Sequence, residues 1–172
     1  MKKLLMAFAV LCSVSVLHAE PDYYAALCAW APGQIPMSSG SVIWGVRVTA
    51  FYGDCTRLNG LDLALGANRT RERFNGLAIA GVFNRVNSAA GAQLGFANVV
   101  ENEFAGLQAG AWNHTGHGYG TQWGIVNTAG YFAGFQLGFF NWADDLDGLQ
   151  IGLVNVVADQ SPCVLPILNI GF

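Results

Sequence analysis

The sequence has little charge, and what charge it has does not suit nucleic acid. Charged residues make up 11% of its 172 residues, well below the roughly 25% of a typical soluble chain. The formal net charge is −3, so there is no basic surface for a nucleic acid partner. The mean hydropathy is +0.37. We therefore expect much of the chain to lie out of water.

Motifs for catalysis and cofactor binding are also missing. There is no Gly-x-Ser-x-Gly elbow, no P-loop and no dinucleotide fingerprint, and no serine or cysteine has a plausible paired base. His114 and His117 are too few for zinc and are predicted to lie in a solvated turn. Asp144, Asp145 and Asp147 lack the closing glutamate of a calcium loop and predict a polar hairpin tip. We predict no enzyme activity, no catalytic or metal site and no small-molecule cofactor.

Long apolar runs are absent except at the N-terminus. Lys2 and Lys3 precede an apolar run over residues 4–17, and Ala19 precedes Glu20. The run is shorter than the roughly 20 residues of a transmembrane helix, and its flanks are typical of a signal peptide. We interpret residues 1–19 as a signal peptide, 20–41 as a lead-in segment and 42–172 as a single β-repeat domain.

Cysteine is sparse. Cys12 falls inside the predicted signal peptide, which leaves Cys28, Cys55 and Cys163 in an exported chain. An oxidising compartment permits disulfides, but three thiols allow at most one bridge and one free cysteine. The sequence leaves their pairing open.

Glycine is abundant, with 22 residues, and recurs with a period. Gly45, Gly60, Gly76 and Gly91 begin a series that continues at spacings of 14 to 16 residues to Gly148. From the fourth copy, each unit also has Gln two residues on, Gly four on and Asn seven on. The residues that define this repeat are Gly91, Gln93, Gly95, Asn98, Gly106, Gln108, Gly110, Asn113, Gly120, Gln122, Gly124, Asn127, Gly134, Gln136, Gly138, Asn141, Gly148, Gln150, Gly152 and Asn155.

Each unit alternates with period 2, which indicates a β-strand. In residues 132–141 one face carries Phe135, Leu137 and Phe139, and the other carries Gln136 between glycines. Polar connectors such as residues 68–73 read as tight turns and offer no second apolar strand. We therefore predict an all-β fold, an antiparallel up-and-down meander or small barrel of about 8–10 strands with one strand per repeat. A β-solenoid is the alternative.

In this meander a turn at Glu101-Asn102 would pair Gln108 with Gly95. The apolar faces would then lie together and are expected to form a buried core, with lipid contact as the alternative. The rows of Gln and Asn are expected to satisfy one another, with sugar or peptide binding as the alternative reading.

The repeat units resemble a known family. The Gly-Leu-Gln-x-Gly-Leu-Val-Asn-type units, the opening Gly45-Val-Arg47, the Gly60-Leu-Asp62-Leu unit and the ending at residues 165–172 are similar to the bacterial surface-repeat proteins. The resemblance covers roughly residues 42–172, although the first three units lack Gln and the cysteines are extra. It implies export and a surface location, with no known biochemical activity.

Together these features predict a non-enzymatic, exported repeat protein at the cell surface or outer membrane of a Gram-negative bacterium. Its role would be structural or interactive, with an unknown surface partner. The alternative is a small integral outer-membrane β-barrel that acts as a pore or adhesin platform.

Overall fold

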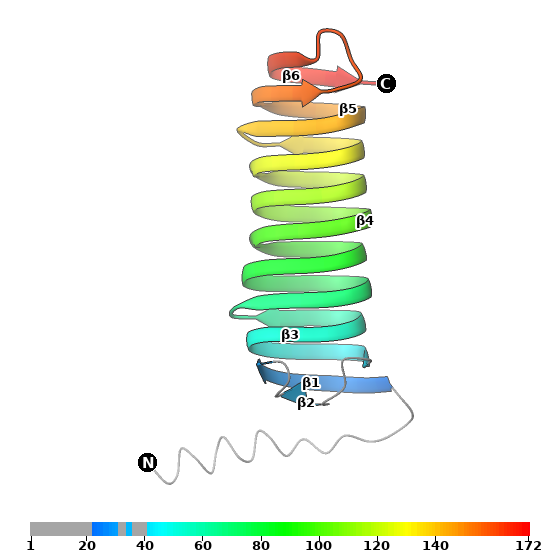
Figure 1. The fold of residues 1–172 in the computed structure, drawn as a ribbon, viewed down its shortest axis with the longest axis vertical. Coiled ribbons are helices and arrows are strands. Elements are labelled where there is room, and N and C mark those ends of the chain that lie inside the picture. Colours follow the sequence, from blue (N-terminus) through cyan, green and yellow to red (C-terminus); the bar gives the residue numbers. More distant parts are fainter. Residues whose placement is uncertain (1–21, 31–33, 36–40) are drawn as a thin grey trace.

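The chain folds as a β-solenoid. The computed structural model describes residues 22–30, 34–35 and 41–172, which form about seven turns stacked along one axis (Figure 1). Within this part of the chain there is no helix long and apolar enough to cross a membrane. The predicted signal peptide lies outside the described residues.

Six strands make one sheet that winds round the solenoid. They are β1 (Asp22–Trp30), β2 (Gln34–Ile35), β3 (Val42–Ala64), β4 (Ala67–Leu137), β5 (Phe140–Val157) and β6 (Val164–Gly171). Neighbours β1 and β3, β3 and β4, and β4 and β5 pair in parallel, whereas β2 and β6 add antiparallel strands at the two ends. The parallel stack thus includes β1, which lies in the expected lead-in segment.

The meander or barrel prediction is wrong, because each repeat is one full turn of a parallel coil. Gly134 pairs with Gly148 and Gln136 with Gln150, so like residues lie above one another. The expected antiparallel pair of Gln108 with Gly95 is not formed, since the Gln108 side chain bonds to Gln93 instead. Residues 68–73, predicted to be a turn, belong to β4. The all-β class is confirmed and the solenoid alternative is the fold that forms.

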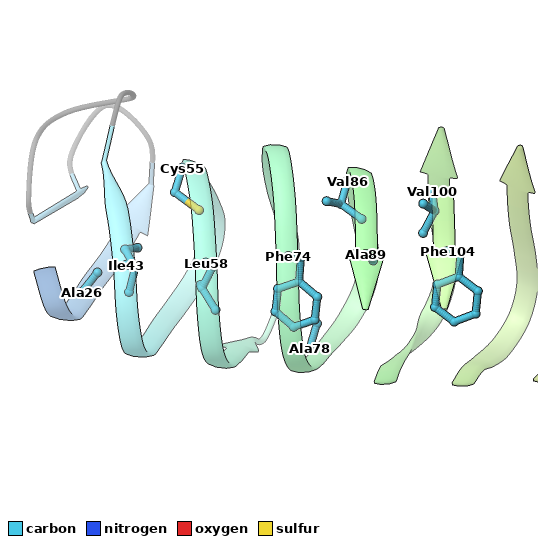
Figure 2. Packing of buried hydrophobic residues seen from close by; sticks show 10 residues of the cluster. All are labelled: Ala26, Ile43, Cys55, Leu58, Phe74, Ala78, Val86, Ala89, Val100 and Phe104. Atoms are coloured by element: carbon cyan, nitrogen blue, oxygen red, sulfur yellow. The ribbon is translucent and has the colours of Figure 1, made fainter. Parts of the chain in front are cut away.

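The coil closes without a second apolar strand because single inward side chains fill the interior (Figure 2). One column, two residues before each repeat glycine, is apolar from Ile43 to Leu146. In it the buried rings of Phe74, Phe104 and Phe132 are separated by small residues. A second column on the other side of the coil is Val86, Val100, Thr115, Ala129, Ala143 and Val157. Alternating large and small residues lets successive coils pack closely.

The repeat glycine itself is required by the backbone. The eight glycines from Gly45 to Gly148 have φ between 124° and 153°, a region that residues with a Cβ rarely adopt. A Cβ added at Gly106 would also overlap the carbonyl oxygen of Gly91 in the preceding coil. The glycine that recurs in each repeat therefore marks the position at which the backbones of successive coils come closest.

Two ladders of buried amides run through the interior. Gln108, Gln122, Gln136 and Gln150 each donate from Nε2 to Oε1 of the Gln one coil earlier, over 2.7 to 3.1 Å. The Asn ladder runs the other way: each Asn from Asn84 to Asn141 donates from Nδ2 to the next Oδ1, over 2.8 to 2.9 Å. The expectation that these amides satisfy one another is confirmed.

The fourth-residue glycine makes space for the Asn ladder. A Cβ at Gly124 would lie 2.6 Å from Asn113 Nδ2 and 3.0 Å from Asn127 Oδ1. The Gln, Gly and Asn series therefore belong to one packing arrangement, in which the amides stack and the glycine leaves room for them.

The C-terminal end of the stack is closed by β6. After residues 158–163 the chain reverses, and β6 pairs antiparallel with β5, placing Asn169 opposite Gln150. Both side chains are buried. Pro166 lies within β6, and a proline weakens the strand's capacity to template another strand.

Candidate interaction surface

The Gln and Asn rows are not a binding surface. From Gln93 to Gln150 and from Asn84 to Asn155 their relative exposure is 2% or less. Each central amide is also hydrogen-bonded within its ladder, as described above. A sugar or peptide therefore cannot reach these groups in the folded chain.

The outward residues of the same strands form an uninterrupted apolar surface. We define the apolar face as the residues one, three and five positions after each repeat glycine. They are Val46, Val48, Ala50, Leu61, Leu63, Leu65, Leu77, Ile79, Gly81, Ala92, Leu94, Phe96, Leu107, Ala109, Ala111, Thr121, Trp123, Ile125, Phe135, Leu137, Phe139, Leu149, Ile151 and Leu153. None carries a charge, and Thr121 is the only polar side chain among them.

This face is exposed to solvent, which corrects the prediction that it forms the core. Leu65 is 81% exposed, Phe96 66%, Leu153 64% and Trp123 62%, and none of the face residues is buried. The inversion follows from the stacking. The amides and glycines pack into close register inside the coil, so the bulky residues between them must point outward.

A shallow groove runs along the C-terminal half of the apolar face. Its volume is about 420 Å³ and its floor is formed by Gly124, Gly138 and Gly152. Trp123, Leu137 and Ile151 border it on one side, and Phe139 and Leu153 on the other, with Ile167 of β6 at its end. The groove exists because the glycines that make room for Asn inside also leave a gap between two rows of side chains outside.

Ion pairs join neighbouring coils elsewhere on the outer surface, which also carries exposed apolar side chains such as Phe51, Val82 and Trp112. Arg57 pairs with Glu72 over 2.6 Å, and Arg85 pairs with Glu101. Arg71 pairs with Asp54 over 2.5 Å. The first two pairs are exposed, and such pairs each contribute little to stability, whereas Asp54 of the third is largely buried. All of these charges lie outside the apolar face.

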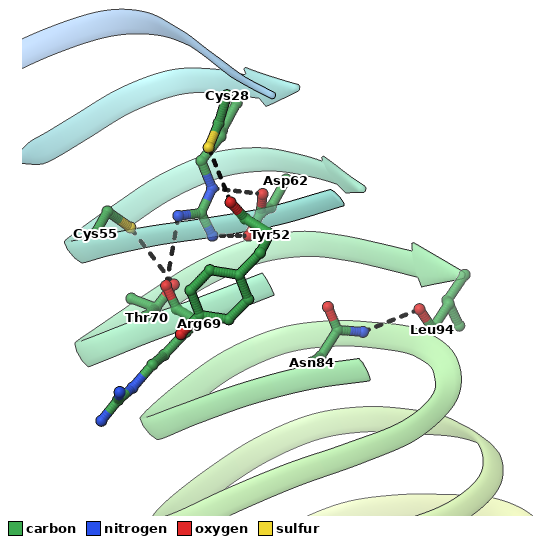
Figure 3. A network of polar contacts seen from close by, with 9 residues as sticks. Cys28, Tyr52, Cys55, Asp62, Arg69, Thr70, Asn84 and Leu94 are labelled. Atoms are coloured by element: carbon green, nitrogen blue, oxygen red, sulfur yellow. Dashed lines mark hydrogen bonds and ion pairs between the residues drawn. The ribbon is translucent and has the colours of Figure 1, made fainter. Parts of the chain in front are cut away.

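One ion pair is buried, in the column that the Gln ladder occupies further on (Figure 3). Arg47 donates from Nε and Nη2 to the two carboxylate oxygens of Asp62, over 2.8 and 2.6 Å. Burial alone would lower the pKa of Arg47, but Asp62 more than offsets this, so the pKa is raised. Arg47 and Asp62 thus occupy the same inward face as the glutamines, and their charges stabilise each other inside the coil.

None of the three described cysteines forms a disulfide. Cys28 and Cys55 are buried and Cys163 is exposed. Burial raises the pKa of the Cys28 and Cys55 thiols, although nearby Arg47 lowers it in part. Cys28 Sγ contacts the Tyr52 carbonyl oxygen at 3.0 Å, and Cys55 Sγ lies 3.6 Å from Thr70 Oγ1. The structure therefore does not use the disulfide that the sequence allowed.

The histidines and the aspartate cluster do not converge on a site. His114 is half-buried, with Nδ1 2.9 Å from Thr128 Oγ1, and burial lowers its pKa. His117 is exposed and faces Tyr131. Asp144 accepts a hydrogen bond from the Trp142 indole. Over residues 22–30, 34–35 and 41–172, no group of three or more His, Cys, Asp or Glu could hold a metal ion.

Sequence reasoning missed which way the two faces of each strand point. A signal was present: each Gln follows the previous one after 14 or 15 residues, about one turn of a parallel coil, and a Gly is placed where the Asn side chain needs space. An exposed apolar surface of this size usually marks an interaction site.

Comparison with protein-family models, with curated proteins and with solved structures gives no match to this chain.

Proposed function

We propose that the protein is a non-enzymatic, exported surface-repeat protein of a Gram-negative cell envelope that works by contact through its apolar face. The observation that carries the proposal is the continuous exposed apolar face on a stack whose two amide ladders are turned inward. The predicted signal peptide and the resemblance to the bacterial surface-repeat proteins support the location.

The apolar face is suited to contact with another macromolecule. Apolar patches on monomeric soluble proteins rarely exceed a few hundred Å², and this face covers every turn from Val46 to Leu153. The solenoid that carries it is held by two hydrogen-bonded ladders, so the face is presented as a rigid surface.

Location can be tested on intact cells through the exposed thiol of Cys163. A membrane-impermeant maleimide should label the wild-type protein without permeabilisation, and a Cys163→Ser variant should not be labelled. Labelling that appears only after the outer membrane is opened would overturn the surface location.

Contact through the face can be tested by photo-crosslinking in the same cells. A benzophenone side chain in place of Phe96, which is 66% exposed on the face, is expected to give protein adducts. The matched control places it at Tyr119, which is 53% exposed on the polar surface. Equal yields at both positions, or no protein adduct at Phe96, would contradict the proposal.

A further inference from the structure

The occupant of the apolar face follows from its shape, area and surrounding charge. We propose that the face binds the same face of a second copy of this chain, with the two solenoids antiparallel. This inference rests on the proposed contact function and names its partner.

The face is regular enough to pack against a copy of itself, because its coils are stacked in register. Its rows run along the stack with one side chain per coil, about 4.8 Å apart, and two such sheets pack about 10 Å apart. The gap over Gly124, Gly138 and Gly152 adds a groove between rows. Side chains of one copy can therefore enter between those of the other.

The area matches what a stable dimer needs. The face is five residues wide, about 16 Å at about 3.3 Å per residue, and about 38 Å tall with β6 included. Leu168 and Ile170 of β6 lie in register with Ile151 and Leu149, so they extend it. That gives about 600 Å² per copy, or about 1,200 Å² for the pair, the lower limit of stable interfaces. With no charge on it, the face buries no unpaired ion.

A lipid surface is the less favourable occupant. After Lys3 the chain has no lysine, and its six arginines are outnumbered by acidic residues. Proteins that lie on membranes usually combine an apolar face with a basic surface that attracts anionic lipid. This chain has the apolar face and the opposite charge.

The distribution of charge favours the antiparallel arrangement. Residues 42–90 contain six arginines and three carboxylates, for a net charge of +3, whereas residues 91–172 contain six carboxylates and no arginine or lysine, for −6. An antiparallel pair places the positive half of each copy beside the negative half of the other. A parallel pair places like beside like, which is unfavourable over a Debye length of about 10 Å.

Two-fold symmetry leads to the same arrangement. In a parallel pair the symmetry axis runs along the stack, so each coil meets its own copy at the same height and its side chains meet head-on. In an antiparallel pair the axis crosses the stack, and the coils can be staggered by half a spacing. Such an interface is closed and stops at two copies.

The test is the oligomeric state of the exported protein, measured by sedimentation equilibrium. Wild type is expected to be a dimer. Leu94→Glu adds a charge at the centre of the face and should raise the dimer dissociation constant at least about 100-fold. Ala105→Glu, on the exposed polar surface, is the matched control and should leave the dimer intact. Far-UV circular dichroism establishes that both variants are folded.

Orientation is read from spin-label distances in a Cys163→Ser background. Trp112→Cys places a label beside the face near the middle of the stack, and Val154→Cys places one beside the face near the C-terminal end. In the antiparallel dimer, centred on the face with β6 included, the two labels at 112 lie at about the same height along the axis, and those at 154 are about six coils, or about 29 Å, apart. Equal distances at both positions would overturn the antiparallel arrangement.

The remaining outcomes distinguish a second copy from lipid or a different protein as the partner of the face. A folded wild-type monomer, or a dimer unaffected by Leu94→Glu, would overturn the self-association. Binding of the monomer to phosphatidylethanolamine and phosphatidylglycerol vesicles, lost in Leu94→Glu, would replace the second copy with lipid. A crosslink from position 96 to a different protein would agree with the proposed contact function but would contradict the proposed self-association.

Discussion

At the scale of single residues, this fold depends on positions where the backbone leaves no room. Gly106 combines a φ of 136° with a carbonyl oxygen of the preceding coil where its Cβ would lie. Arg47 and Asp62 are a different case, because two charges are buried together and each is tolerated only through the other.

Gly106→Ala is expected to lower the free energy of unfolding by at least about 3 kcal/mol, since it adds left-handed strain to a backbone clash. Ala105→Gly, at the exposed neighbouring residue, should cost only about 0.5–1 kcal/mol. Urea unfolding followed by circular dichroism compares the two. Equal losses would mean that the positive φ and the stacking contact do not constrain this position.

Asp62→Ala should cost about 3–5 kcal/mol, because Arg47 would remain buried without its carboxylate. The double variant Arg47→Gln with Asp62→Gln places in both positions the residue that the same column carries further on. It is expected to recover most of the loss in the same urea assay. A double variant no more stable than Asp62→Ala would contradict this account of the pair.

At the scale of elements, the coils are joined by ladders whose inner and outer rungs differ in their hydrogen bonds. Gln122 donates to Gln108 and accepts from Gln136. Gln150 donates to Gln136, but its own Oε1 has no hydrogen-bond partner.

Removing an inner rung should therefore cost more than removing the last one. Gln122→Ala is expected to lower the free energy of unfolding by about 2–4 kcal/mol, because it leaves one acceptor and one donor buried without partners. Gln150→Ala should cost about 1–2 kcal/mol less, since within the ladder it leaves only the Gln136 acceptor without a partner. Both variants also lose one hydrogen bond to a backbone carbonyl, that of Thr128 or Val156. Thermal and urea unfolding of both variants measure the difference, and an equal cost would rule out the ladder as the source of the stability.

At the scale of the whole molecule, the three thiols report on opening of the stack. Cys163 is exposed, whereas Cys28 and Cys55 are buried and have raised pKa values, so little reactive thiolate forms at neutral pH. One thiol per chain is expected to react with an aromatic disulfide reagent under native conditions, and three in denaturant. Cys163→Ser should abolish the native reaction. Native reaction of two or three thiols would show that the N-terminal coils open readily.

Much of the fold was predictable, because the spacing of the sequence repeat gives the length of the structural unit directly. The strand assignment came from the alternation around Gln136, and the all-β class came from its recurrence. The direction of stacking was not predictable from that alternation, because parallel and antiparallel pairing both keep Phe135 and Leu137 on one side of the strand. The turn assigned to residues 68–73 failed because the segment continues as strand: Asn68 and Thr70 are buried inside the coil, and the charged side chains between and after them point outward.

The sequence by itself determined the repeat, the strands, the segregation of amides from aliphatic residues and the scarcity of catalytic groups. Only the tertiary structure decided which of the two faces is inside. Buried amides are costly alone, and hydropathy therefore argued for Leu and Phe as the core. In a parallel stack, however, each Gln and Asn meets an identical side chain one coil away and completes its hydrogen bonds with it. That long-range register turns the amides inward and leaves the apolar face outside, where a partner can reach it.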